Sequence, residues 1–256
     1  KDGVSPMTRK KPLAAEEPEE QETALAVFKA QYPALTADVG ALLRDSLGEG
    51  ATLGFNDLPT VRVPAGGGLI WTLPSGEPTR VVEGVVVLYQ AVRAFWSTPF
   101  TGGGVPPDCA SEDAITGSGL YGQLSEINPT GLCNECPMSK WASGKDNTQA
   151  CRHMTRLFML LEDSIVPTLV LLPPSSFKAA RWYVRDTAIV HRKQLTALLT
   201  RISLTEDKSD KGIIYSKALF TEPEPLPDDV AAALAVYRTR IAPFLQRLPI
   251  REREDE

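Results

Sequence analysis

A stretch over residues 98–150, rich in glycine, proline and asparagine, sets the strongest limit on how this chain can fold. It has hardly any hydrophobic periodicity, and a loop of roughly fifty residues is rare in a compact domain unless something besides a core holds it. All four cysteines of the chain lie in this stretch or at its edges: Cys109, Cys133, Cys136 and Cys151. The sequence therefore predicts that the cysteines hold the stretch in place.

The cysteine spacing, Cys-x23-Cys-x2-Cys-x14-Cys, predicts one structural zinc ion bound by Cys109, Cys133, Cys136 and Cys151. Two cysteines separated by two residues reach one tetrahedral ion from a single tight turn, and metal binding contributes directly to folding. Four thiolates leave no open position for water, so the expected role is structural. The spacing is also compatible with a redox dithiol at Cys133 and Cys136, with two disulfides, and with four separate buried thiols.

Composition and charge place the chain among ordinary globular proteins: 43% of its 256 residues are hydrophobic and 23% are charged. The basic residues near the start are not followed by an apolar stretch, and no apolar run approaches the length of about 20 residues that a membrane span needs. We therefore expect a cytoplasmic protein. The net charge of −5 is uneven, because residues 13–24 and 251–256 are acidic while the centre is slightly basic, so the total charge does not exclude a nucleic-acid partner.

The periodicity predicts a mainly β (α+β) protein with flanking N- and C-terminal helices. Residues 81–96, 154–161 and 166–172 have the pattern of strands, about 176–190 that of a helix, and about 195–205 and 212–220 that of two more strands. This is the element order of an OB-fold, a small barrel that binds oligonucleotides. The predicted division is a disordered acidic arm (1–21), a helical segment (22–52), an OB-fold-like domain (53–222) with a zinc-binding insertion at about 98–151, a C-terminal helix (223–248) and a charged tail (249–256).

Aromatic and basic residues occur where an OB-fold presents its binding surface. Single-stranded nucleic acid is bound by aromatic rings that stack on bases and by cations that pair with phosphates. The expected contacts are Tyr89, Trp96 and Trp141 with bases, and Arg93, Arg152, Arg156, Lys178, Arg181 and Lys208 with phosphates. The alternative for each is an ordinary one: a core ring, a cover for the cysteine site, or a solvated helix face.

Several segments resemble a family of proteins encoded by bacteriophages and other mobile elements. The resemblance covers about residues 53–248 and is carried by 54–59 (GFNDLP), 64–68 (PAGGG), 106–111 (PPDCAS), 133–137 (CNECP), 141–144 (WASG) and 172–176 (LPPSS). It implies a bacterial host cell but no particular activity. At the level of fold, a four-cysteine insertion in an OB-fold is similar to the zinc-bearing domain of the large subunit of replication protein A, and to the helix-destabilising protein of T4-type phages. That resemblance implies binding of single-stranded DNA.

The resulting hypothesis is a sequence-independent, non-catalytic single-stranded DNA-binding protein of a phage or mobile element, acting in replication or recombination. Its acidic ends would recruit replication or recombination proteins. The alternative is a protein-interaction module, such as an assembly subunit or an anti-defence factor. An enzyme is not expected, because His153 and His191 are the only histidines and neither lies in a recognisable catalytic pattern.

Overall fold

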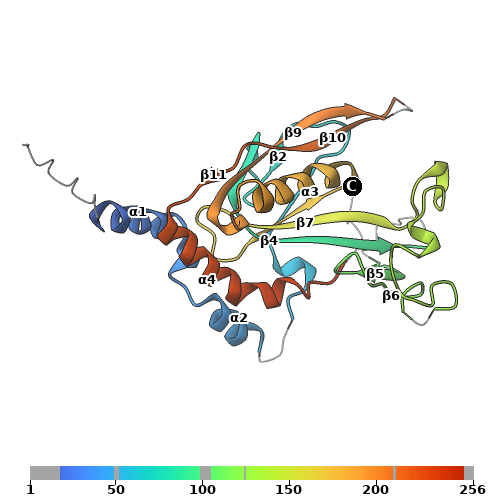
Figure 1. Ribbon diagram of the computed structural model, residues 1–256, viewed down its shortest axis with the longest axis horizontal. Coiled ribbons are helices and arrows are strands. Elements are labelled where there is room, and N and C mark those ends of the chain that lie inside the picture. Colours follow the sequence, from blue (N-terminus) through green and yellow to red (C-terminus); the bar gives the residue numbers. More distant parts are fainter. Residues whose placement is uncertain (1–17, 49–51, 99–104, 124, 210–211, 251–256) are drawn as a thin grey trace, which may run out of the picture.

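A large curled β-sheet forms the body of the protein, and helices pack against both of its faces (Figure 1). The computed structural model describes residues 18–48, 52–98, 105–123, 125–209 and 212–250. The α-helices of these residues are α1 (Pro18–Gln31), α2 (Val39–Leu47), α3 (Pro174–Ile189) and α4 (Asp228–Leu245). The strands of the large sheet are β1 (Thr60–Arg62), β4 (Val81–Phe95), β5 (Cys109–Ser111), β6 (Ser118–Gly119), β7 (Arg152–Leu160), β8 (Thr168–Leu172), β9 (Leu198–Lys208), β10 (Ile214–Phe220) and β11 (Glu224–Pro225). A separate pair consists of β2 (Trp71–Thr72) and β3 (Pro78–Thr79), and short 3₁₀ helices connect other elements: η1 (Pro33–Leu35), η2 (Phe55–Asp57), η3 (Pro137–Ser139), η4 (Lys145–Asn147) and η5 (Leu195–Ala197).

The long strand β4 gives the sheet its curl, because it pairs with two different partners. Val81 to Gly84 pair with β9, whereas Val85 to Ala94 pair with β7, both antiparallel. The change of partner falls at Gly84, where a Cβ would lie 2.5 Å from the carbonyl oxygen of Leu160. Only glycine allows the two backbones to approach this closely. The long strand that the sequence predicted is therefore bent at Gly84, at the corner of the sheet.

The predicted order of strands and helix is confirmed, whereas the predicted OB-fold-like barrel is not confirmed. The elements β4, β7, β8, α3, β9 and β10 follow one another as expected. Closing them into a barrel requires the two ends of the curled sheet to pair. Instead β8 takes β1 as its second neighbour, in parallel, and β10 pairs only with β9 among the described strands. The sheet is thus a half-barrel in a protein of mixed α and β structure.

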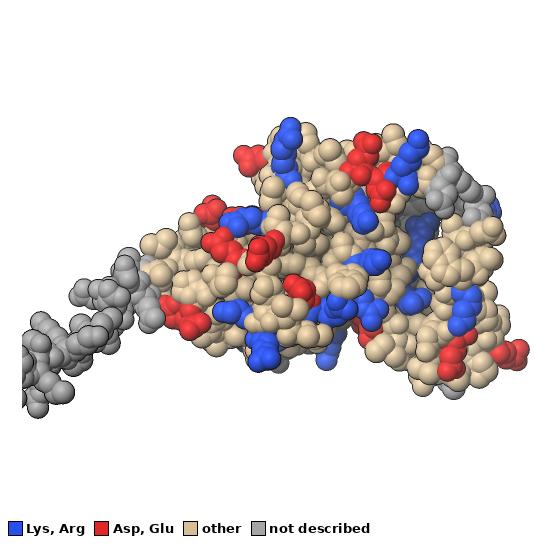
Figure 2. Space-filling model, turned by 45° about the horizontal axis from the view of Figure 1, so that its top comes forward, with Lys and Arg blue, Asp and Glu red and all other residues tan. Residues whose placement is uncertain are grey.

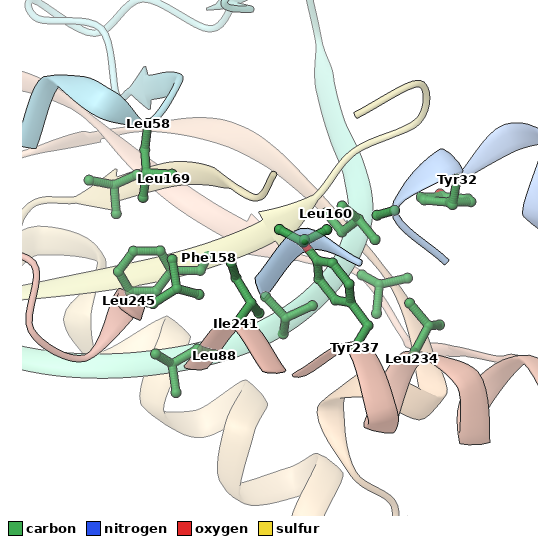
Figure 3. Close-up of a cluster of buried hydrophobic side chains, with 14 of the residues drawn as sticks. Tyr32, Leu58, Leu88, Phe158, Leu160, Leu169, Leu234, Tyr237, Ile241 and Leu245 are labelled. Atoms are coloured by element: carbon green, nitrogen blue, oxygen red, sulfur yellow. The ribbon is translucent and has the colours of Figure 1, made fainter. Parts of the chain in front are cut away.

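Two hydrophobic clusters on opposite faces of the sheet anchor the helices. Along β7, Leu157 and Met159 point into the cluster beneath α3, and Phe158 and Leu160 into the cluster beneath α4. This alternation is the period of two of a strand buried on both faces. Figure 3 shows the second cluster, in which Phe158 and Leu160 lie beside Leu234, Tyr237, Ile241 and Leu245 of α4. The sheet therefore separates an α3 side from a side covered by α1, α2 and α4.

The cysteine-bearing stretch forms a lobe at one end of the sheet, on the right in Figure 1. We use "lobe" for its described residues, 105–123 and 125–150. Apart from β5, β6 and two short 3₁₀ helices, it consists of turns held by backbone hydrogen bonds such as Cys133 N to Ile115 O at 2.8 Å and Cys151 N to Met138 O at 2.8 Å. Its strand β5 pairs with the end of β4, so the sheet itself anchors the lobe.

The predicted disordered arm and charged tail fall largely outside the described residues. The predicted arm (1–21) lies outside the described residues up to residue 17, and α1 begins at Pro18. The predicted charged tail lies outside them from residue 251 onward. None of the helices in the described part of the chain combines the length and the apolar character that crossing a membrane requires.

Candidate functional site

A cleft of about 240 Å³ lies where β1 and β8 end, β7 begins and α3 starts. Its walls combine apolar, aromatic and basic side chains. The lining residues are Arg62, Val63, Pro64, Ala65, Gly66, Trp96, Arg152, Met154, Leu171, Leu172, Pro173, Pro174, Ser175, Tyr215 and Ser216. They come from both ends of the curled sheet, since β1 and β8 contribute one wall and β10 the other. The cleft therefore exists because the half-barrel is open.

The loop over residues 64–68 bridges the two ends and forms one wall of the cleft. The hydroxyl of Ser216 on β10 donates a hydrogen bond to the carbonyl oxygen of Gly68, at 2.7 Å. At Gly67, φ is +83°, and a Cβ would lie 2.5 Å from Cγ2 of Ile214. Glycine is thus needed twice, for the backbone conformation and for the close contact. The glycine run of residues 66–68 is therefore part of the wall of the cleft.

Trp96 and Arg152 form the polar end of the cleft. The Arg152 guanidinium carbon lies 5.8 Å from the centroid of the Trp96 ring, within the range of a cation–π interaction. The indole N–H donates to the carbonyl oxygen of Val105 at 3.0 Å, which fixes the ring against the lobe. Both residues also line a second cavity of about 440 Å³, shared with Lys145 and its neighbours in the lobe. Trp96 and Arg152 therefore line both the cleft and the second cavity.

The helix α3 begins at the cleft and carries a row of cations away from it. Lys178, Arg181 and Arg185 are exposed, as the sequence predicted for one helical face. The Arg185 guanidinium carbon lies 3.7 Å from the centroid of the Trp182 ring, which is 51% exposed. Figure 2 shows lysines and arginines gathering across the centre of this face and in the hollow beside the lobe. The row on α3 is therefore a local basic patch in a chain whose net charge is −5.

The other predicted binding residues have different surroundings. Trp141 projects from the lobe and is 76% exposed. Lys208 is exposed at the end of β9, opposite Ile214 of β10. Tyr89 is half-buried beneath α3, and burial raises the pKa of its hydroxyl. Trp141 and Lys208 can meet a ligand at the surface, whereas Tyr89 belongs to the packing of the α3 side.

Arg156 does not lie at the surface, and its predicted contact with phosphate is corrected. The residue is 1% exposed, and its guanidinium donates to the carbonyl oxygens of Leu248 and Pro249, both at 2.7 Å. Burial lowers the pKa of Arg156 to about 10. Strand alternation explains the error: Arg156 points to the face covered by the C-terminal segment, so it ties that segment to the sheet.

Arg93 and His153 are paired across β4 and β7 on the α3 side. Nε and Nη1 of Arg93 and Nε2 of His153 are buried, and these three atoms have no hydrogen-bond partner among the described residues. The imidazole packs on Phe177, with the ring centroids 3.9 Å apart. Burial, together with Arg93 and Arg181, lowers the pKa of His153 to about 4. Arg93, which the sequence predicted to contact phosphate, is thus half-buried in the structure.

The zinc prediction is wrong. In the part of the chain that the structure describes, which includes all four cysteines, no group of three or more His, Cys, Asp or Glu side chains is arranged to hold a metal ion. Cys109, Cys133, Cys136 and Cys151 are free and buried, so the disulfide alternative is not observed either. Burial raises the pKa of the Cys109 thiol, and it raises that of Cys151 to about 12. The spacing brought the thiols near one another, but the lobe is held by hydrogen bonds and by packing of Cys109 and Cys151 on Phe95.

Trp182 was missing from the predicted site, although helical periodicity could have identified it. The core-facing positions of α3 include Ala180 and Tyr183, and a helix turns by 100° per residue. Trp182 follows Ala180 by two residues and therefore points away from the core. Arg62 and Tyr215 were missed for a different reason: they meet at the cleft only because distant strands come together.

No family model, curated protein or solved structure matches the chain.

Proposed function

We propose that this protein binds single-stranded DNA along its α3 side, independently of base sequence and without catalysis. One observation carries the proposal: two aromatic–guanidinium pairs, Trp96–Arg152 and Trp182–Arg185, lie at the cleft and on the basic face of α3. Trp182 is 51% exposed and Trp96 is half-buried in the lining of the cleft. Such rings offer stacking surfaces to any base, and neighbouring cations pair with the backbone. Such pairs offer an unpaired strand both a surface for base stacking and a positive charge for its phosphates.

The fold supports the same proposal by analogy. The order of three strands, a helix and two strands is that of an OB-fold, here opened at the β8–β10 junction. We propose that the half-barrel is a modified OB-fold, with β1 in the place where a closed barrel would pair its last strand. A role in replication or recombination of a phage or mobile element follows from the sequence resemblance and stays a prediction. The same holds for recruitment of partner proteins by the acidic ends, of which residues 13–17 and 251–256 lie outside the described residues.

Titration of a fluorescent oligo-dT at several salt concentrations tests the proposal. Five exposed cations line the expected path: Lys145, Arg152, Lys178, Arg181 and Arg185. For single strands, each phosphate neutralised contributes about −0.7 to the slope of log K against log salt, so five give about −3.5. The absence of binding at low salt would refute the proposal.

Charge reversal locates the surface. In the variant Arg181→Glu we expect weaker binding and a salt slope that is smaller in magnitude by about 0.7. The matched control is Arg240→Glu, since Arg240 is also exposed but belongs to α4 on the other side of the sheet. Equal losses in both variants would show that binding follows total charge and not the α3 side.

A further inference from the structure

The cleft is too apolar to be only a path for a phosphate backbone. Pro64, Leu171, Leu172 and Pro173 line it together with Met154. The basic and aromatic residues of the lining are Arg62, Trp96, Arg152 and Tyr215. A backbone with one charge per nucleotide has no use for apolar walls. A ligand that fits the cleft must have a flat apolar part and a negatively charged part.

The volume of the cleft limits the size of the ligand that it can hold. An apolar cavity of about 150 Å³ is known to accommodate a benzene molecule. The cleft has about 240 Å³, which is enough for one heterocyclic ring with its substituents but not for a stack of two bases. The Trp96 ring at its wall offers the face on which such a ring stacks.

The positive charge of Arg152 at the cleft complements the negatively charged part of the ligand. Arg152 is exposed, and it faces Trp96 without a carboxylate among its contacts in the described residues. A phosphate attached to the ring can therefore approach the guanidinium, which recognises phosphate oxygens with two parallel hydrogen bonds.

From this geometry we infer that the cleft holds one unstacked nucleobase, with its 5′-phosphate at Arg152. The inference rests on the proposed function and specifies it: one base of the bound strand leaves the stack and enters the half-barrel through its open side, while the flanking nucleotides follow α3. Unstacking one base of a single strand costs little compared with a duplex. A closed barrel would have no such opening.

Calorimetry with small fragments of DNA tests the inference directly. The probes are thymidine 5′-monophosphate, thymidine and inorganic phosphate at millimolar concentration, with oligo-dT titrated in the same buffer. We expect the monophosphate to bind, thymidine to bind more weakly, and phosphate alone to bind least. Binding of phosphate as strong as that of the nucleotide would overturn the role of the base.

Filling the cleft provides the matched comparison. Ala65 is exposed and lines the cleft, so Ala65→Phe places a ring in the opening at little risk to the fold. Because one stacked base contributes about 1–3 kcal/mol, we expect nucleotide binding to weaken by about 5- to 150-fold. The control is Ala232→Phe at an exposed position of α4. Arg152→Ala is a second variant, expected to weaken binding of the monophosphate but not of thymidine.

The outcomes separate the two proposals. Oligo-dT binding that is equal in wild type and Ala65→Phe, without nucleotide binding, would overturn the base cleft and leave the DNA-binding surface intact. Nucleotide binding that Ala65→Phe removes, without oligo-dT binding, would support the cleft and overturn the proposed function. Failure of every probe to bind would overturn both.

Discussion

Substitution of Gly84 tests whether the corner of β4 depends on the absence of a side chain. In Gly84→Ala the added Cβ would lie 2.5 Å from the carbonyl oxygen of Leu160 and 2.9 Å from Cδ2 of Leu161. The carbonyl is part of β7, so relief requires the two strands to separate. Overpacking of this kind costs about 1–3 kcal/mol, and the lower entropy of alanine in the unfolded chain offsets about 0.5–1 kcal/mol.

We therefore expect a net loss of about 1 kcal/mol, which in a domain of this size lowers Tm by about 2–4 °C. The assay is thermal unfolding followed by circular dichroism, with urea unfolding to obtain the free energy. The matched control is Gly40→Ala in α2, where the nearest atom to the new Cβ is Arg44 Nη1 at 3.4 Å. This control should raise stability by about 0.5 kcal/mol. If Gly84→Ala unfolds at the wild-type temperature or above, the argument that close approach at Gly84 creates the corner is wrong.

Three further substitutions test separate parts of the structure. Arg156→Met removes both hydrogen bonds to the C-terminal segment and should lower the free energy of unfolding by about 2–4 kcal/mol in urea titrations; an unchanged midpoint would contradict this role. His153 has its pKa lowered to about 4 by burial and by nearby arginines, so the unfolded chain takes up the proton first as the pH falls. Stability should therefore decline by about 1–3 kcal/mol between about pH 6.5 and 4, less steeply in His153→Phe but not in the control His191→Gln. Trp182→Ala should weaken oligo-dT binding by about 1–3 kcal/mol while leaving Tm nearly unchanged, because the ring is 51% exposed.

Local sequence patterns gave the elements with good accuracy. The strand expected over residues 81–96 is β4 (Val81–Phe95), the helix expected over about 176–190 is α3 (Pro174–Ile189), and the last hairpin is formed by β9 and β10. Each depends on neighbours in the chain: β-branched runs, a Pro-Pro-Ser-Ser start and a charged turn. Such signals act over a few residues and are readable from one sequence.

The site was predictable only in part. Trp96, Arg152, Lys178 and Arg181 lie at the cleft or on α3, where aromatic and basic residues had indicated a surface. The prediction for Arg156 was wrong, because a charged residue in a strand can point to either face of the sheet. The segment that covers that face decides the role of the residue. The zinc prediction was wrong for a related reason. The spacing of the cysteines allows their thiols to come close together, but metal coordination also depends on side-chain directions that the whole lobe sets.

The order of strands and helix follows from the sequence alone, because each element reflects interactions between residues close in the chain or a simple period. The open side of the half-barrel does not. It arises because Thr60 to Arg62 pair in parallel with Leu169 to Leu171, more than a hundred residues away, and leave β10 with β9 as its only described partner. Which strand takes the free edge of β8 is a competition between distant segments for the same backbone hydrogen bonds, so only the tertiary structure decides it.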